Sequence, residues 1–213
     1  SPVCGNNVTN MSYTYYFCNK LIGPPVCGPN VTDMSNAYYQ CNKLTGDPVC
    51  GPNVTNMDLA YRGCYKITGQ PVCGDKVTSM RLTYQNCSLT GSPVCGPNVT
   101  SMDGTYYQCH KLTGSPVCGD KVKDMSSAYL RCFNLTGSPV CGPNVTTMSH
   151  TYFECRNLTG NPVCGNNVTN MYNAYYNCPN LYGDMFVYND KISNATNCFY
   201  RRNTNRQLTI SVD

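Results

Sequence analysis

Cysteine is the residue type with the greatest chemical potential in this chain, which holds 17 of them in 213 residues. Sixteen of them form two rows of eight, an outer row in a recurring Pro-Val-Cys-Gly tetrapeptide and an inner row 14 residues further along, and Cys198 follows the last copy. Up to Cys178, the spacings between successive cysteines therefore alternate between 14 and 9 residues, with a single spacing of 8. Zinc sites favour cysteine pairs separated by two to four residues. The spacing predicts neither a metal site nor any other cofactor.

The inner cysteines lie on an apolar periodic stripe, where free cysteine packs as a small hydrophobe. We expect a column of buried free thiols, with disulfides as the alternative and metal ligation third. In the outer row, bridges between stacked neighbours would be strained, because strands lie about 4.8 Å apart and a disulfide prefers Cβ atoms about 3.8 Å apart. The odd total leaves at least one cysteine without an intramolecular partner. The inner column comprises Cys18, Cys41, Cys64, Cys87, Cys109, Cys132, Cys155 and Cys178.

Residues for acid, base or nucleophilic catalysis do not recur in any register. The two histidines, His110 and His150, fall at different positions of different repeats, and no acid pair or glycine-rich phosphate loop recurs. Isolated aspartates at turns are typical of caps rather than of general acids; these are Asp33, Asp58, Asp103 and Asp124. The sequence predicts a protein that is not an enzyme.

Eleven Asn-x-Ser/Thr sequons occur, and six of them are one repeated Asn-Val-Thr tripeptide, so they are not independent observations. We interpret the tripeptide as a turn asparagine followed by a β-branched packing segment. In a eukaryotic secretory pathway the same exposed positions would be glycosylated. The repeated asparagines are Asn7, Asn30, Asn53, Asn98, Asn144 and Asn167.

A 23-residue unit, written eight times, must position these residues. One residue is missing from the fourth copy, between Cys87 and Leu89. A fixed period of this length predicts a solenoid whose units pack only on their neighbours. We expect residues 1–182 to be eight coils, part of a longer array without its N-terminal cap. Residues 183–213 read as a divergent final coil and the start of a C-terminal cap, with strands at 185–188 and 208–212.

Each unit divides into two predicted elements. Met34, Ala37, Tyr38, Cys41 and Leu44 have the spacing of one helical face, which predicts a short α or 3₁₀ helix. The segment Pro48-Val49-Cys50 reads as a short parallel strand, with the valine inward and its two neighbours outward. The fold class is therefore a leucine-rich-repeat-like solenoid. A column of methionines should fill its interior, at Met11, Met34, Met57, Met80, Met102, Met125, Met148 and Met171.

The stretch Asn53-Val54-Thr55-Asn56-Met57, followed by Tyr61 and Cys64, resembles the BspA-like leucine-rich repeats of bacterial surface proteins. The same pattern runs from Asn167 to Cys178, and the resemblance covers essentially the whole chain. It implies a right-handed, curved solenoid used for adhesion or attachment on a cell or a phage tail. It names no ligand, because fold does not fix function.

Composition favours an extracellular, cell-surface or virion-surface location, with 12% charged residues, no tryptophan and 18 tyrosines. The net charge is +4, and we interpret the basic residues as scattered over different registers, so we expect no nucleic-acid partner. The chain has no apolar run long enough to span a membrane, which predicts no direct membrane insertion. The expected partner is a protein or glycan receptor on a cell surface. The alternative is a structural fibre, in which the chain binds copies of itself.

The fifth residue after each methionine should point away from the inner stripe of the predicted helix. Five of its eight occupants are aromatic, a composition typical of interface hot spots. Alternatively, these rings lie over the adjacent coil and shield the core. We call this row the candidate binding strip; it contains Tyr16, Tyr39, Arg62, Tyr107, Phe153 and Tyr176, with Gln85 and Leu130 in the other two copies.

Overall fold

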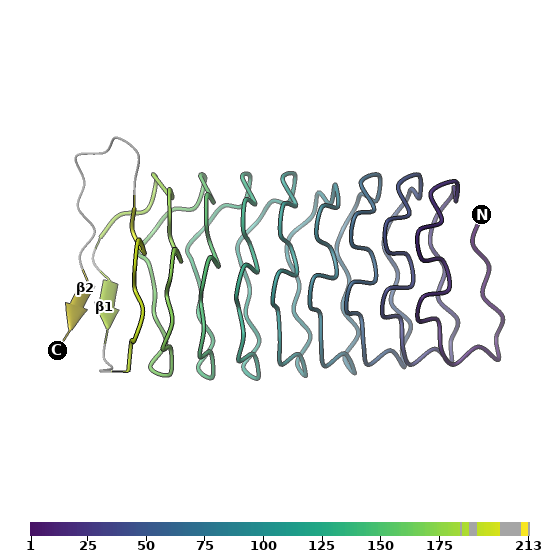
Figure 1. Cartoon of the computed structure of the whole chain (residues 1–213), viewed down its shortest axis with the longest axis horizontal. Helices are drawn as coiled ribbons and strands as arrows, with labels where there is room; N and C mark the ends of the chain where they lie inside the picture. The colour runs from purple at the N-terminus through teal and green to yellow at the C-terminus, as the bar shows by residue number, and fades with distance from the viewer. Residues whose placement is uncertain (184, 188–190, 201–209, 213) are drawn as a thin grey trace.

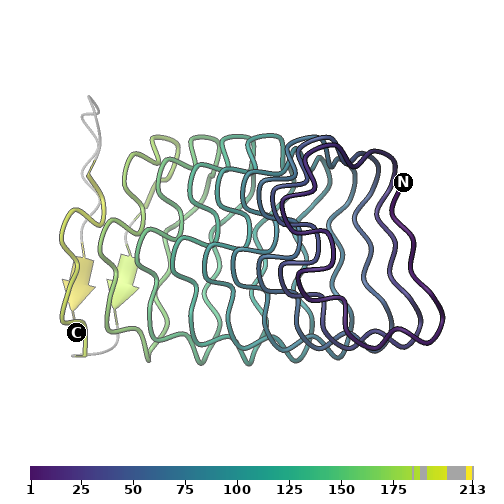
Figure 2. The same ribbon diagram turned by 45° about the vertical axis from the view of Figure 1, so that its right-hand side comes forward.

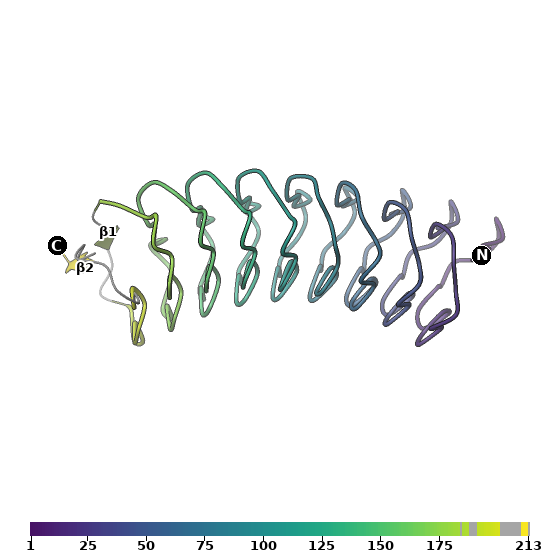
Figure 3. The same ribbon diagram turned by 90° about the horizontal axis from the view of Figure 1, so that it is seen from above.

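The chain forms a row of stacked coils in a computed structural model that describes residues 1–183, 185–187, 191–200 and 210–212. Figure 1 shows the coils side by side, with the N-terminus at one end of the row and the C-terminus at the other. The same coils are seen from an oblique direction in Figure 2, and Figure 3 shows that the row curves gently. Each coil accommodates one copy of the repeat, so equivalent residues of successive copies lie next to one another.

The predicted fold class, a leucine-rich-repeat-like solenoid with a strand and a helix in each coil, is wrong. The described residues contain no helix, and their only strands are β1 (Met185–Val187) and β2 (Ile210–Val212). These two pair in parallel, with Phe186 opposite Ser211. Elsewhere the coils are joined by isolated parallel bridges, mainly at the residue before each methionine, as between Asn56 and Ser79.

A run of tight turns replaces the predicted helix. In the second copy Asn36 and Gln40 have φ values of 56° and 59°, the left-handed region that an α-helix excludes. Alternate amides leave the coil: the N–H of Tyr38 donates to the carbonyl of Ala60 in the next coil at 2.8 Å. The amide just before Tyr38 stays within its own coil, since Ala37 N–H donates to Met34 O at 3.0 Å. Backbone hydrogen bonds therefore tie neighbouring coils together and form no helical ladder.

The predicted Pro-Val-Cys strand is also wrong, and its orientation is reversed. Pro48 is buried while Val49 is half-exposed. Proline has no N–H to donate to a neighbouring strand, so no ladder forms at this segment. The apolar proline ring packs inward. The Tyr61 hydroxyl satisfies the valine backbone instead: it accepts from Val49 N–H at 3.1 Å and donates to Val49 O at 2.7 Å. We call this arrangement the tyrosine clamp.

The tyrosine clamp recurs in all eight copies, from Tyr15 on Val3 to Tyr175 on Val163. Its rings stack from coil to coil with centroids 5.3–5.7 Å apart. All eight methionines of the predicted column are at most 1% exposed, so that prediction is confirmed. The tyrosine column also continues past the missing residue, since the rings of Tyr61, Tyr84 and Tyr106 remain 5.7 Å apart.

Beyond the eighth copy, residues 191–200 stack on its coil. Met171 N–H donates to Asn194 O at 2.7 Å, and Tyr175 N–H donates to Cys198 O at 2.9 Å. The strands predicted at 185–188 and 208–212 coincide with β1 and β2 in part, while Tyr188 and Leu208 lie outside the described residues. The division at residues 182 and 183 remains a prediction.

Candidate functional site

The candidate binding strip lies on the wall made by the turns, one residue beyond each clamp tyrosine. Tyr16 is 42% exposed, and the other strip residues are half-buried except Gln85, which is buried. The predicted helix does not exist, so the strip faces outward for a different reason. In the second to eighth copies the turn run buries the two residues before the strip position, as at Ala37 and Tyr38, and leaves the strip residue half-buried except at Gln85.

Aromatic side chains gather at the N-terminal end of the strip. The rings of Tyr16 and Tyr39 stack at 4.9 Å, and Phe17 meets Tyr16 edge-on at 4.7 Å. The Tyr13 ring lies 5.2 Å from the Tyr16 ring, between centroids. Tyr13, Tyr16 and Phe17 are 58%, 42% and 52% exposed, and Tyr13 and Phe17 flank the strip residue Tyr16 on the first coil, which has a neighbouring coil on one side only. An exposed aromatic cluster of this kind is typical of a binding surface.

A second aromatic cluster lies at the C-terminal end, where Phe153 stacks on Tyr176 at 4.5 Å and Tyr176 stacks on Tyr200 at 4.8 Å. The middle of the strip is more polar. The Arg62 guanidinium lies 5.5 Å from the Tyr39 ring, a cation–π contact. Gln85 Oε1 is buried and has no hydrogen-bond partner among the residues described. The stacked rings at the two ends of the strip thus cover one another's faces in part.

The 17 cysteines are free thiols in the structure. Seven of the eight inner ones are buried, whereas Cys18, in the first coil, is exposed. The buried thiols donate to the preceding coil, as Cys64 Sγ does to Tyr38 O at 2.9 Å. Burial raises the pKa of the Cys41 thiol to about 12. The outer row is half-buried rather than exposed, and desolvation raises the pKa of Cys27 to about 11.

Thiol reactivity is therefore expected to separate Cys18 from the rest of the inner column. The thiolate is the nucleophile, and a pKa of about 12 leaves little thiolate at neutral pH. Iodoacetamide should modify Cys18 first, the outer row next and the buried inner thiols, Cys41 among them, last, and the Cys41 rate should rise with pH. Mass spectrometry of timed, quenched digests measures this order. Uniform modification of both rows, or regular disulfides in non-reduced protein, would contradict it.

Five of the six Asn-Val-Thr asparagines, all but Asn7, bridge neighbouring coils. Asn30 Nδ2 donates to Asn6 O at 2.8 Å, and Asn53 Nδ2 donates to Pro29 O at 2.9 Å. The following threonine hydroxyl also points to the preceding coil, as Thr55 Oγ1 does to Thr32 O at 3.1 Å. Asn98, Asn144 and Asn167 make the same Nδ2 bridge. Glycosylation would occupy the nitrogen that these bridges use.

The aspartates considered for catalysis have structural partners. The Asp33 and Asp124 carboxylates each accept the amide N–H two residues onward at 2.8 Å, the geometry of an Asx turn. Asp58 accepts Arg81 N–H at 2.9 Å, and Asp103 pairs with the Arg81 guanidinium at 3.4 Å. Among the described residues, no group of three histidine, cysteine or acidic side chains is arranged to hold a metal ion.

Sequence reasoning missed one row of basic residues. Lys20, Lys43, Lys66 and Lys111 each lie nine residues after a methionine, at exposed positions of the turn that follows the inner cysteine. Basic residues are thus not scattered over all registers, and the recurring Cys-x-Lys-Leu/Ile was the signal that reveals the row. We call these four residues the lysine row; it is interrupted at the fourth copy, where the missing residue falls.

Comparison of the chain with protein families, with curated proteins and with solved structures finds no match in any of the three. The resemblance to BspA-like repeats therefore gains no support from them. No helix among the described residues is long and apolar enough to cross a membrane. A functional assignment must accordingly rest on the surfaces described above.

Proposed function

We propose that this chain is a non-enzymatic, extracellular or virion-surface scaffold that binds a protein or glycan receptor through the candidate binding strip. The observation that carries the proposal is the exposed aromatic cluster of Tyr13, Tyr16 and Phe17, continued by Tyr39. Aromatic side chains supply large contact area at low cost in conformational entropy. The stacked coils hold these rings at fixed spacing, so little further ordering accompanies binding.

A structural fibre is the second candidate function. The coils stack in one direction through backbone hydrogen bonds, and a bridged row of this kind can extend by the same contacts. Light scattering and electron microscopy of the purified chain distinguish the two functions. A monodisperse soluble species that binds cells supports the receptor-binding scaffold, whereas long filaments without cell binding support the fibre.

The paired substitution Tyr39→Ser with Tyr107→Ser is expected to reduce cell binding at least tenfold, because aromatic hot spots each contribute about 2 kcal/mol or more. The melting temperature should fall by only a few degrees, because both rings are half-buried. Binding of the labelled protein to cultured cells is measured by flow cytometry at several concentrations.

The matched control is Thr45→Ser with Thr113→Ser, which changes exposed residues of the same two coils away from the strip. The control should bind as the unmodified chain does. If the tyrosine variant loses stability steeply while each folded molecule binds normally, the strip only packs the coils together and the proposal is wrong.

A further inference from the structure

The missing residue of the fourth copy changes the wall of the stack. In the other copies the residue three after the inner cysteine closes a turn, as Leu44 N–H does by donating to Cys41 O at 3.1 Å. In the fourth copy Ser88 and Leu89 follow Cys87 directly, and Ser88 N–H donates instead to Ile67 O of the preceding coil at 3.1 Å. This coil therefore lacks the projecting turn that its neighbours have.

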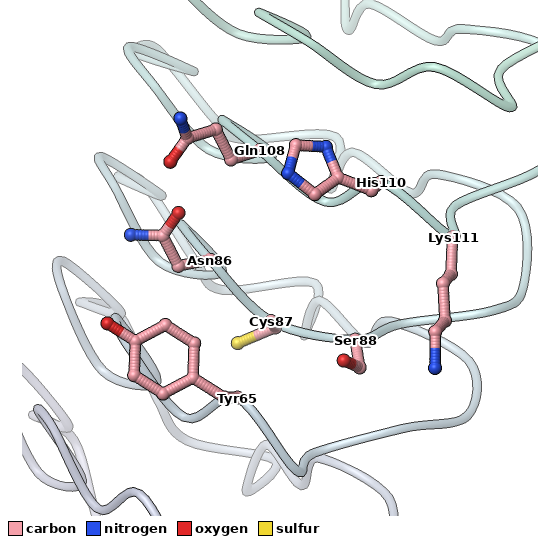
Figure 4. Close-up of a pocket in the computed structure, with 7 residues that line it drawn as sticks. All are labelled: Tyr65, Asn86, Cys87, Ser88, Gln108, His110 and Lys111. Carbon is pink, nitrogen blue, oxygen red and sulfur yellow. The ribbon is translucent and has the colours of Figure 1, made fainter.

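A pocket of about 200 Å³ lies where that turn is absent. Figure 4 shows side chains from three successive coils around it: an aromatic ring from the third coil, an amide and a hydroxyl from the fourth, and an amide, an imidazole and an ammonium group from the fifth. The volume is below the roughly 300–1,000 Å³ of drug-sized ligand sites, which limits the occupant to a small chemical group. These side chains belong to Tyr65, Asn86, Ser88, Gln108, His110 and Lys111.

The polar groups of the pocket are available for a ligand. In the sixth and seventh copies the positions equivalent to Asn86 and Gln108 hold Arg131 and Glu154. These two bind each other, since Arg131 Nε donates to Glu154 Oε2 at 3.0 Å. The side-chain amides of Asn86 and Gln108 make no hydrogen bond within the described part of the chain. Among the residues that the structure describes, the Lys111 ammonium forms neither an ion pair nor a hydrogen bond.

His110 is held in a fixed orientation at the pocket. Its ring stacks on Phe133 with centroids 4.6 Å apart, and its Nδ1 lies 2.9 Å from the carbonyl oxygen of Arg131. In the neutral ring, Nδ1–H donates to that oxygen, which leaves Nε2 as an acceptor. The pocket thus combines an acceptor, two amides, a hydroxyl and a cation.

We propose that this pocket binds one carboxylate-bearing sugar residue of a surface glycan. A sugar ring offers an apolar C–H face for the Tyr65 ring, which is 49% exposed, and hydroxyls that both donate to and accept from amides. Its carboxylate pairs with Lys111. The proposal rests on the proposed function only in taking the glycan as the receptor. The pocket borders the candidate binding strip, since Asn86 and Gln108 directly follow Gln85 and Tyr107 in the chain.

The lysine row gives an acidic glycan a path to the pocket. Lys66 and Lys111 lie on the coils on either side of the fourth copy, and Lys43 and Lys20 continue the same register toward the N-terminus. Like-charged side chains along one face attract a polyanion at long range, an effect that salt screens. A chain of acidic sugars can therefore follow the row and place one residue in the pocket.

The test uses the full 213-residue chain with two probes, methyl β-D-glucuronide and methyl β-D-glucoside, titrated by NMR. We expect saturable glucuronide binding with a Kd of about 1 mM and weaker glucoside binding. Lys111→Ala should weaken glucuronide binding about tenfold or more and leave glucoside binding unchanged, because it removes a charge-assisted hydrogen bond. Lys43→Ala, in the same register of the second coil, is the matched control and should change binding less than twofold.

A second variant restores the repeat length by inserting one asparagine between Ser88 and Leu89. The insertion should rebuild the turn, close the pocket and abolish glucuronide binding while the chain stays folded. Equal glucuronide binding by the unmodified and inserted chains, or no binding to the unmodified chain at about 10 mM, would overturn the proposal. Cell binding that depends on Tyr39 and Tyr107 but survives the insertion would sink the pocket alone and leave the strip as the contact surface.

Discussion

Replacing Tyr106 by phenylalanine is expected to lower the free energy of unfolding by about 2–4 kcal/mol, although it removes a single oxygen atom. The Tyr106 hydroxyl accepts from Val94 N–H at 3.0 Å and donates to Val94 O at 2.8 Å, and its ring is fully buried. Without it, two backbone groups of the Pro-Val-Cys segment lose their partner at once. No neighbouring strand replaces it, since this segment forms no ladder.

Tyr15→Phe is the matched control for this prediction. Tyr15 forms the same clamp on Val3, at 2.8 and 2.6 Å, but Val3 is 77% exposed. Water can therefore satisfy the freed backbone groups, and the cost should stay below about 1 kcal/mol. Guanidinium unfolding followed by circular dichroism and tyrosine fluorescence measures both variants. If Tyr106→Phe and Tyr15→Phe lower the free energy of unfolding by similar amounts, the buried clamp hydroxyl contributes no more than the exposed one.

The residues that fill the interior could be predicted from the sequence, because burial leaves a periodic record. Met57, Ala60, Tyr61 and Cys64 are all fully buried, as their spacing indicates. The same spacing nevertheless led to the prediction of a helix, which is wrong. A run of turns with a left-handed residue at every fourth position buries the same four positions, so periodicity alone does not separate the two backbones.

Glycines were the overlooked signal against a helix. Gly63 and Gly104 occupy two of the left-handed positions, with φ of 74° and 58°, and asparagine occupies others, including Asn36 and Asn173. Glycine in a helix interior costs about 1 kcal/mol of stability relative to alanine. Glycine and asparagine both tolerate positive φ. Between each methionine and the inner cysteine that follows it, glycine and asparagine occur only in these two registers, which favours a turn run. The inter-coil hydrogen bonds that stabilise it are non-local, and no local propensity encodes them.

The candidate site was predictable in position but not in geometry. The strip falls at variable residues between buried ones, which the eight copies reveal by comparison. Which rings stack, such as Phe153 on Tyr176 at 4.5 Å, is seen only in the structure. The pocket was predictable only as a missing residue after Cys87, because its lining comes from three coils that the sequence separates by 23 residues or so.

The outer cysteine row has a packing explanation in the glycine that follows each of these cysteines. A Cβ atom placed on Gly51 would lie 2.8 Å from Cys27 Sγ and 3.0 Å from Gly28 O in the preceding coil. At Gly74 the same atom would lie 3.2 Å from Cys50 Sγ and 3.5 Å from Gly51 O. Each outer thiol thus occupies the space that a side chain would need, which requires neither a disulfide nor a metal to explain the row.

Gly51→Ala is accordingly expected to lower the free energy of unfolding by about 1–3 kcal/mol, the usual cost of overpacking. Gly74→Ala should be within about 1 kcal/mol of neutral, because its contacts are looser and alanine restricts the unfolded chain. In the double variant Cys27→Ala with Gly51→Ala, removing the sulfur should recover part of the loss. Chemical unfolding of the unmodified chain, the single variants Cys27→Ala and Gly51→Ala, and the double variant gives the coupling energy directly. Additive losses, or equal costs at the two glycines, would show that the thiol and the glycine do not share this space.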